Sequence, residues 1–415
     1  MTDQGEKSTY LILGGTGFIG RNLVQYLAEQ KLASKIYVAD KKMYSMAYMH
    51  EDHQKAFKDK DLVKFYQTDL AQDPHVKKAF AEKVDYVINL CGETRSAMSE
   101  KDYQLRIVTP AEKCAKAAAK MGVKKWIEVS TAHVYKENSK KPSDEKAKLD
   151  PWTAIAKCRL EAEKKVASVD GLPVVILRPA IVYGKGDKMG LTPRMAVAPV
   201  YKQEKEISDN DVMNNNASYF VSMKVMKFLW VAGLKLNTVH VQDMCRSIEL
   251  ACKKIKPGST YNVSDKGNSD QGLVNGLIGD IFEVKTAFMG WMASKAAARP
   301  KEEKMMLDRV VNSVNERHVP AFTEICQEQK IFNTPISPYL DKEVLKNKGL
   351  CIDGGAIEKD EGFKYTHPKV TKELLEEQLK FMQLSQIEVG AYQYKVLEIQ
   401  IDAKCKKAWI TSQQY

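Results

Sequence analysis

Residues 8–30, STYLILGGTGFIGRNLVQYLAEQ, decide the fold of this chain. The apolar run at 10–13 predicts a buried strand, and the apolar spacing within 21–29 predicts an amphipathic helix. Glycines follow the predicted strand, among them Gly14, Gly17 and Gly20. A strand, a glycine-rich turn and a helix in this order are a much stronger signal than the glycines alone.

The glycine-rich turn suits the binding of a dinucleotide. Glycine permits a tight turn, lets a pyrophosphate approach backbone N–H groups, and allows the helix to pack closely on the strand. The anion then lies at the N-terminus of the helix, where unpaired N–H groups point outward. We therefore expect residues 14–20, with Phe18 and Ile19 at the start of the helix, to bind the cofactor.

An acidic residue follows where this kind of site binds the ribose. The second predicted strand, KIYVAD at 35–40, ends in Asp40, about twenty residues beyond the glycines. A carboxylate there binds the ribose 2′-hydroxyl, which favours NAD over NADP. Lys41 and Lys42 come next and would tolerate a 2′-phosphate, so NADP stays the less favoured alternative.

Strands and helices alternate through the first part of the chain. Further strands are predicted at 63–70, 84–92, 123–131 and 173–180, and helical stretches such as 110–122 separate them. This alternation indicates a parallel sheet with helices on both faces. The chain is therefore predicted to be an α/β protein built on a doubly wound Rossmann sheet.

The composition is that of a globular protein with a basic surface. Of 415 residues, 44% are hydrophobic and 28% are charged, close to globular averages. The net charge of +11 favours acidic partners, but no aromatic-interleaved basic motif indicates a nucleic-acid reader. The eight cysteines lack the spacing of a disulfide framework or a zinc site, so no metal is expected. Without a membrane-length apolar span or a secretory or presequence-like N-terminus, we expect a cytosolic protein.

Several motifs together resemble one family, the extended short-chain dehydrogenases/reductases, which include NAD-dependent epimerases and dehydratases and 3β-hydroxysteroid dehydrogenases. The motifs come in family order and span roughly residues 8–265: GGTGFIG (14–20), TDL (68–70), VSTAHVY (129–135), AKCRLEAEK (156–164), LRPAIVYGKGD (177–187), NTVHVQD (237–243) and YNVSD (261–265). The stretch 362–379 looks like the closing segment of the family.

The resemblance implies a role for each matching residue. The three glycines would hold the pyrophosphate and Asp40 the adenosine ribose, while Asp69 and Leu70 would flank the adenine. The end of the fourth strand would line the cofactor with Leu90, Cys91 and Gly92. Thr131 matches a residue that hydrogen-bonds the substrate oxygen, and Lys157 matches the lysine that binds the nicotinamide ribose.

The acid/base residue that the resemblance implies is missing. The family has a tyrosine four positions before the lysine, one helical turn away on the same face. Here that position is Thr153. An aliphatic hydroxyl is far too weak an acid for this role, and losing a general acid/base typically costs about 10²–10⁴ in rate. His133 is a possible substitute because its reference pKa lies near neutrality.

A second departure lies in the helix before VSTAHVY. Where the family has an Asn and a Gly-Thr pair, this chain has Arg106, Thr109 and Pro110. Thr109 can cap a helix, Pro110 suits its first turn, and Glu112 completes a capping box. We therefore expect a helix to break or restart at Thr109.

The domain boundaries follow from where the strand–helix alternation stops. We expect a Rossmann domain at 1–187, completed by 236–265, in which 237–252 returns to the main sheet. A smaller substrate-side domain would comprise 188–235 and 266–384, and its Met-rich stretch at 287–314 could line an apolar pocket. The extension at 385–415 alternates apolar and polar residues like a docking strand.

Two functions remain open on the sequence. One is an NAD-binding, catalytically impaired member that serves as a structural or cofactor-sensing subunit. Its protein partner would be reached through the basic surface and the 385–415 tail, on an acidic scaffold such as a cytoskeletal polymer. The other is an active oxidoreductase or epimerase for a sterol-like or sugar substrate, with His133 in place of the tyrosine. Nucleic-acid binding has only the net charge behind it.

Overall fold

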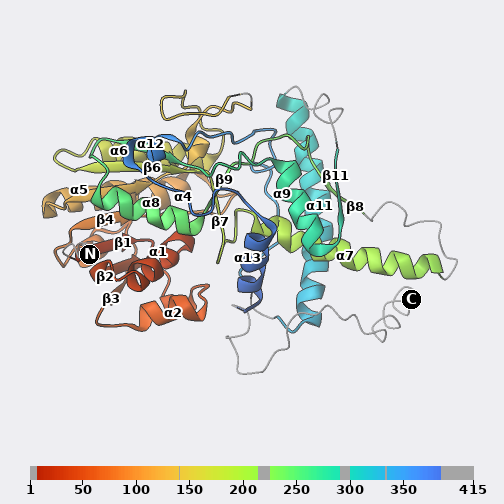
Figure 1. Cartoon of the computed structure of the whole chain (residues 1–415), viewed down its shortest axis with the longest axis horizontal. Coiled ribbons are helices and arrows are strands. Elements are labelled where there is room, and N and C mark those ends of the chain that lie inside the picture. Colours follow the sequence, from red (N-terminus) through yellow and green to blue (C-terminus); the bar gives the residue numbers. More distant parts are fainter. Residues whose placement is uncertain (1–6, 140, 214–224, 290–299, 332–333, 385–415) are drawn as a thin grey trace.

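A seven-stranded parallel sheet forms the core of the larger part of the protein, on the left in Figure 1. The structure is a computed structural model and describes residues 7–139, 141–213, 225–289, 300–331 and 334–384. The strands run in the order β10-β6-β5-β4-β1-β2-β3. Their bounds are β1 (Ser8–Leu13), β2 (Ala33–Asp40), β3 (Val63–Gln67), β4 (Tyr86–Asn89), β5 (Lys125–Val129), β6 (Val174–Pro179) and β10 (Thr260–Val263).

The predicted strands and the doubly wound sheet are confirmed. The chain moves outward from β1 to β2 and β3, then crosses to β4 on the other side of β1. The strand order therefore reverses between β1 and β4. In open parallel sheets, ligands bind in the crevice at the carboxyl ends of the two strands that flank such a reversal.

Helices cover both faces of this sheet. One hydrophobic cluster joins one face to α1 and α8, and a second joins the opposite face to α5 and α6. The strands are buried on both faces, which accounts for their nearly continuous apolar sequences. The helices packed on the sheet or at its ends are α1 (Phe18–Glu29), α2 (Glu51–Lys58), α3 (Asp73–Ala79), α4 (Glu100–Tyr103), α5 (Thr109–Met121), α6 (Ala154–Ala167), α8 (Val241–Lys253) and α12 (Ala356–Glu361).

A smaller, mostly helical part lies beyond one end of the sheet (Figure 1). Its helices are α7 (Thr192–Met213), α9 (Gln271–Phe282), α11 (Pro300–Glu328) and α13 (Lys372–Leu384). It also contains a two-stranded parallel pair, β8 (Val225–Phe228) with β11 (Lys285–Phe288). A separate hydrophobic cluster, which includes Met195, Ile278 and Leu375, joins α7, α9 and α13.

The expected break at Thr109 is wrong. Helical backbone runs without interruption from α4 through a π-helical segment, η2 (Gln104–Val108), into α5. Thr109 has φ −58° and ψ −48°, which are helical rather than N-cap values. Pro110 cannot donate a backbone hydrogen bond, and its ring crowds the carbonyl one turn earlier. The wider π turn directly before it accommodates the proline without ending the helix.

The expected return of 237–252 to the main sheet is partly wrong. The strand β9 (Thr238–His240) pairs with β7 (Ile181–Tyr183) in a separate two-stranded sheet. The next strand, β10, is the one that joins the main sheet, beside β6. The helix between them, α8, packs on α1 as a Rossmann helix would.

The segment at 362–379 closes onto the sheet domain through a buried carboxylate. The side chain of Asp243 at the start of α8 accepts hydrogen bonds from the backbone N–H groups of Thr366 and His367, at 2.9 and 2.8 Å. This contact joins two parts of the chain that the sequence resemblance placed in one family pattern. The predicted strand at 385–415 lies outside the described residues.

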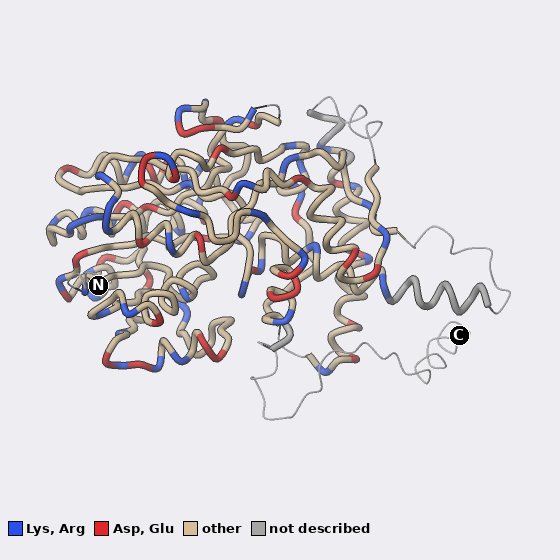
Figure 2. Tube along the Cα trace, viewed as in Figure 1, with Lys and Arg blue, Asp and Glu red and all other residues tan. Residues whose placement is uncertain are grey.

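Charged residues of both signs are dispersed along the described chain. Figure 2 shows Lys and Arg interspersed with Asp and Glu along most of the elements. Within the described ranges, no helix is long and apolar enough to cross a membrane, and no cluster of His, Cys, Asp and Glu could hold a metal ion.

Candidate functional site

The glycine-rich turn lies at the carboxyl end of β1, in the crevice beside β4. Gly14 has φ +74°, a conformation that glycine adopts without strain, and its N–H donates to the carbonyl of Ala39 at 2.8 Å. A Cβ on Gly14 would come within 2.8 Å of the Leu90 carbonyl oxygen. Gly17 is the N-cap of α1, so the free N–H groups of this helix face the crevice. These residues form a cradle that fits a pyrophosphate.

Gly20 and its neighbours bring α1 close to β1. A Cβ on Gly20 would lie 2.5 Å from the Cα of Gly15, so only glycine fits there. Phe18 and Ile19 start the helix and are partly buried against the core. Their side chains therefore hold the helix in place, and the backbone of this turn is the part available to a ligand.

Arg21, which the sequence reading did not single out, supports the same turn. Its guanidinium is buried and donates to the carbonyls of Thr16 and Gly186. One side chain thus ties the glycine-rich turn to the loop after β7. Burial lowers the pKa of Arg21 to about 10. The only sign of this role in the sequence is an arginine directly after the last glycine. Nothing in the sequence indicates that it reaches the Gly186 carbonyl.

Asp40 ends β2 beside the turn, as predicted. One carboxylate oxygen accepts the N–H of Thr16 at 3.0 Å, and the other accepts the N–H of Lys42 at 3.1 Å. These contacts fix the carboxylate next to the glycine-rich turn. The adenosine ribose of a bound dinucleotide would lie here.

Asp69 and Leu70 follow β3, farther along the same edge. Asp69 forms an ion pair with Lys41 at 3.0 Å. Partial burial alone would raise the pKa of Asp69, but the hydrogen bond from Lys41 helps to hold it below its usual value. Leu70 is only 2% exposed and belongs to the core, so its side chain is not available to an adenine.

The end of β4 meets the glycine-rich turn, as the prediction for Leu90, Cys91 and Gly92 requires. A Cβ on Gly14 would touch the Cα and N atoms of Cys91 at 2.9 Å. Burial raises the pKa of the Cys91 thiol to about 12, with the nearby Asp40 carboxylate contributing. The cysteine is therefore a neutral wall of the crevice rather than a nucleophile.

Thr131 and His133 form a pair after β5. The Thr131 hydroxyl lies 3.0 Å from Nδ1 of His133, within the short helix η3 (Ala132–Val134) and its N-cap. The imidazole packs edge-on against Trp152, with ring centroids 5.3 Å apart. Burial lowers the pKa of His133 to about 4, so the ring is neutral at physiological pH.

Thr153 and Lys157 lie at the start of α6, beside this pair. The Thr153 hydroxyl accepts the N–H of Ala156 at 3.1 Å, which makes Thr153 the N-cap of the helix. Lys157 is exposed, and its ammonium makes no hydrogen bond or ion pair to the part of the chain that is described. The residues that were predicted to take part in catalysis therefore lie near one another, but the Thr153 hydroxyl serves as a helix cap.

A segment of the smaller part of the protein covers this helix start. Both oxygens of Glu343 lie 3.2–3.3 Å from the N–H of Ala154, and Lys346 donates to the Trp152 carbonyl. Sequence reasoning missed both residues, because nothing in 334–349 marks the distant helix that they contact.

Arg106, which the sequence analysis expected to depart from the family pattern, forms an ion pair. It lies 3.2 Å from Glu93, which also pairs with Arg95 at 2.8 Å. Burial would raise the pKa of Glu93, but hydrogen bonds from Arg95 outweigh it and lower the pKa to about 2. The altered helix therefore anchors the loop that follows Gly92.

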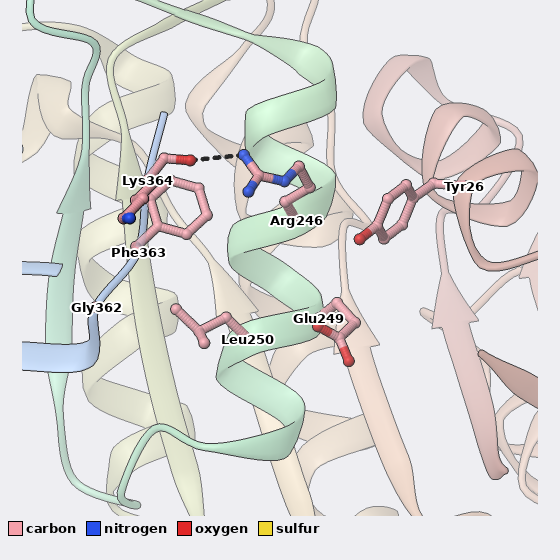
Figure 3. Close-up of a pocket in the computed structure, with 7 residues that line it drawn as sticks. All are labelled: Tyr26, Arg246, Glu249, Leu250, Gly362, Phe363 and Lys364. Carbon is pink, nitrogen blue, oxygen red and sulfur yellow. Dashed lines mark hydrogen bonds between the residues drawn. The ribbon is translucent and has the colours of Figure 1, made fainter. Parts of the chain in front are cut away.

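A cavity of about 250 Å³ lies elsewhere, on the outer face of α8 (Figure 3). It is lined by Tyr26 of α1, by Arg246, Glu249 and Leu250 of α8, and by the chain at 362–364. None of the residues predicted to bind the cofactor lines it. The candidate site is therefore the crevice between β1 and β4.

Comparison with known proteins agrees with this geometry. The family model described as the NAD dependent epimerase/dehydratase family matches residues 10–264. The chain is 30% identical over 181 residues to dTDP-D-glucose 4,6-dehydratase of Mus musculus, covering 42% of this chain and 50% of that protein. The protein of the same description from Dictyostelium discoideum is 27% identical, over 61% of this chain and 57% of its own length. The chain thus spans little more than half the length of these curated relatives.

Solved structures share the fold across most of the chain. The Bordetella bronchiseptica enzyme WbmG in complex with NAD and UDP superposes with a TM-score of 0.61 at 17% identity, covering 92% of this chain and 97% of that one. DesIV, a dTDP-glucose 4,6-dehydratase from Streptomyces venezuelae with NAD bound, gives 0.60 at 16% identity, covering 90% and 97%. Both neighbours contain NAD.

Proposed function

The chain belongs to the NAD dependent epimerase/dehydratase family, and we propose that it is an NAD(H)-binding member in which the usual acid/base step is disabled. The observation that carries the proposal is the role of Thr153. The residue at the tyrosine position caps α6 through its hydroxyl, while the cradle for the dinucleotide is complete.

Cofactor binding is supported by the residues of the crevice. Gly14, Gly17 and Asp40 bring a turn, a free helix N-terminus and a carboxylate to one edge of the sheet. NAD suits this edge better than NADP. Asp40 lies where a 2′-phosphate would have to go, and Lys41 is already paired with Asp69. NAD in the solved neighbours supports the same choice.

Impaired chemistry is supported by the groups that replace the phenol. A tyrosine has a reference pKa near ~10 and can be brought toward working pH by a neighbouring ammonium. A threonine hydroxyl cannot, and this one already accepts a hydrogen bond from Ala156. Lys157 is present, but residue 153 is a threonine, so the phenol whose pKa the ammonium would lower is lacking. The contacts of Glu343 and Lys346 further crowd the helix start.

Such a protein would act through what it binds. We place it as a structural or cofactor-sensing subunit of a larger assembly, with acidic surfaces such as a cytoskeletal polymer as the partner class that suits a net charge of +11. Crosslinking in cell extract would trap the chain with a partner. Recovery of only the free monomer would contradict this role.

The test of the central proposal combines a titration with a rescue. Wild-type protein is titrated with NADH and NADPH by fluorescence, and wild type and Thr153→Tyr are screened with sterol and sugar-nucleotide substrates. We expect NADH to bind more tightly than NADPH, no turnover by wild type, and measurable turnover by the tyrosine variant. Turnover by wild type would contradict the disabled step, and absence of NADH binding would contradict the whole proposal.

A second candidate function is an active oxidoreductase or epimerase for a hydroxyl or keto group of a sterol-like or sugar substrate. The pair of Thr131 and His133 favours it, because Nδ1 of the imidazole lies 3.0 Å from the Thr131 hydroxyl, within reach of a proton transfer. In that case His133→Ala would abolish turnover that wild type shows, whereas His133→Ala in an inactive protein changes no rate.

A further inference from the structure

A carboxylate is completely buried beneath the cofactor crevice. Glu128 lies in β5 and has no exposed surface. Its two oxygens accept hydrogen bonds from Nδ2 of Asn89 at 3.0 and 2.9 Å, and one of them also accepts from Nε1 of Trp126 at 2.9 Å. An acidic residue near the carboxyl end of a central strand requires an explanation, because burying a charge is costly unless it is well paired.

The partners of Glu128 lead directly to the predicted cofactor wall. Asn89 uses its other side-chain atom, Oδ1, to accept the N–H of Cys91 at 3.1 Å. Asn89 therefore joins the carboxylate to the backbone that closes the crevice opposite Gly14. A single amide side chain, only 1% exposed, serves both contacts.

Arg159 holds the other side of the same residue. Its Nη1 donates to the carbonyl of Cys91 at 2.9 Å. Gly92 has φ +151°, and a Cβ there would collide with the Arg159 guanidinium. Asn89 thus holds the N–H of Cys91, and Arg159 holds its carbonyl. Asn89 is linked to Glu128 by hydrogen bonds, and Arg159 is linked to it by charge.

Arg159 is itself a buried cation. The residue is 8% exposed, and no carboxylate in the described chain lies within ion-pair distance of it. Its position on α6, two residues after Lys157, brings it toward the sheet rather than toward solvent. The charge of Arg159 lowers the pKa of the buried Glu128 carboxyl. The two groups therefore interact at longer range than an ion pair.

Several titratable groups surround Glu128. Arg159 and Glu163 face it from α6, Cys91 from the end of β4, and Cys114 from α5. Burial raises the pKa of Glu128 to about 7, while Asn89, Arg159 and Trp126 oppose the rise and Glu163 adds to it. Burial also keeps both thiols neutral. The pKa of Glu128 therefore lies near neutral pH, whereas both neighbouring thiols stay neutral.

We propose that Glu128 is a positioning residue, which acts through Asn89 and Arg159 to hold Cys91 and Gly92 in the arrangement that receives the nicotinamide dinucleotide. This role rests on the proposed cofactor binding. The ionised form fits the site, because all three hydrogen bonds to the carboxylate come from N–H donors. A protonated carboxyl brings a fourth donor into a set that has no acceptor for it, and it no longer attracts Arg159.

The experiment is an NADH titration by fluorescence at about pH 6 and about pH 8, on either side of the titration of Glu128. For wild type we expect affinity to fall about tenfold at the lower pH, the equivalent of one lost hydrogen bond. Glu128→Gln should bind about tenfold more weakly than wild type at the higher pH, and its affinity should no longer depend on pH.

The matched control is Asp265→Asn, another buried carboxylate with a raised pKa, about 6, caused by burial. Asp265 accepts from the Thr238 hydroxyl and lies after the edge strand β10, away from β1 and β4. This variant should keep the wild-type pH profile. A wild-type profile in Glu128→Gln would overturn the proposal while leaving cofactor binding intact.

Two further results are provided for: a Glu128→Gln variant that does not fold, and a wild type that does not bind NADH. If Glu128→Gln does not fold, Arg159→Met tests the other half of the grip, and we expect about tenfold weaker NADH binding at the higher pH. Unchanged affinity in Arg159→Met would overturn the proposal. If wild type fails to bind NADH at either pH, the proposed function itself is wrong, and this role falls with it.

Discussion

The hydroxyl of Thr153 accepts a hydrogen bond from the backbone N–H of Ala156 at 3.1 Å and so caps helix α6. Thr153 is thus a residue that N-caps favour, at the position that the proposed function equates with the family's acid/base tyrosine. On that proposal, the threonine keeps the helix in place and lacks the phenol.

Removing this cap should weaken the fold without affecting the cofactor. We expect Thr153→Ala to lower the free energy of unfolding by about 1 kcal/mol, the typical cost of a lost N-cap. NADH affinity should stay unchanged, because the hydroxyl is occupied by Ala156. Urea unfolding and NADH titration measure the two quantities, and Thr153→Ser serves as the control that retains the cap. A variant with normal stability and lost NADH binding would mean that the hydroxyl contacts the cofactor.

Gly14 offers a sharper test of the crevice. An alanine there would adopt φ +74° and press its Cβ to within 2.8 Å of the Leu90 carbonyl oxygen. We expect Gly14→Ala to weaken NADH binding at least about tenfold, since the turn must shift away from β4. Gly122→Ala is the matched control, because Gly122 has φ +70° and nothing lies within 4 Å of the added Cβ. Both variants bear the same backbone strain, so equal NADH affinities would contradict the crevice as the binding site.

The buried pair of Arg178 and Glu163 should dominate the stability of the sheet domain. The guanidinium donates twice to the carboxylate, at 2.6 and 3.1 Å, and both side chains are more than 90% buried, being 7% and 4% exposed. We expect Glu163→Gln to lower the free energy of unfolding by about 3–5 kcal/mol, because it leaves a buried cation without its partner. Chemical denaturation measures this loss.

An exposed pair provides the contrast. Glu82 lies 3.0 Å from Lys64, and both side chains are close to half exposed. Glu82→Gln should leave stability nearly unchanged, because water already solvates both groups. Similar losses in the two variants would show that burial does not decide the strength of these pairs.

Acid should destabilise the protein partly through His53. Burial, with the charges of Arg21, His50 and Lys185, lowers the pKa of His53 to about 2, whereas an unfolded histidine titrates near ~6.5. The folded state therefore binds fewer protons below that value. The contribution of His53 is complete above about pH 6.5 and falls by up to about 1.4 kcal/mol per pH unit as the pH drops below it.

The variant His53→Gln isolates this contribution. Urea unfolding of wild type and variant at about pH 7 and about pH 5 should show a smaller acid-induced loss in the variant. All other titrating groups are common to the two proteins, so they cancel in the difference. An equal loss in both proteins would show that His53 is protonated in the folded state.

The regular part of the fold could be predicted from the sequence because its signals are local. The main strands and the helix after Gly14 each follow from a run of apolar residues and its spacing. The position of Asp40 and the meeting of Gly14 with Cys91 then follow from the parallel order of the strands. The parallel topology brings residues that were predicted from separate local patterns to the same edge of the sheet.

The errors arose where packing overrides local preference. Thr109 and Pro110 have the chemistry of a helix start, yet the chain takes a π turn and continues. Likewise β9 has the sequence of a sheet strand but pairs with β7 outside the main sheet. Neither outcome could be derived from residues within one turn.

The charged residues under the crevice were missed for a different reason. Arg159 and Arg21 each occupy an ordinary helical position, and only the structure shows that they reach backbone carbonyls far along the chain. Glu128 was the one available signal, a single carboxylate inside the apolar strand β5. A lone charge in such a strand calls for a buried partner, but the sequence does not say which one.

The grip of Arg21 on Thr16 and Gly186 has a consequence for biosynthesis. The turn that receives the dinucleotide ends at Gly20, but its support comes from a carbonyl 165 positions after Arg21. A nascent chain that has emerged only as far as β6 would hold a guanidinium with no second acceptor. The order of translation therefore delays a finished crevice until the loop after β7 has left the ribosome and docked on α1.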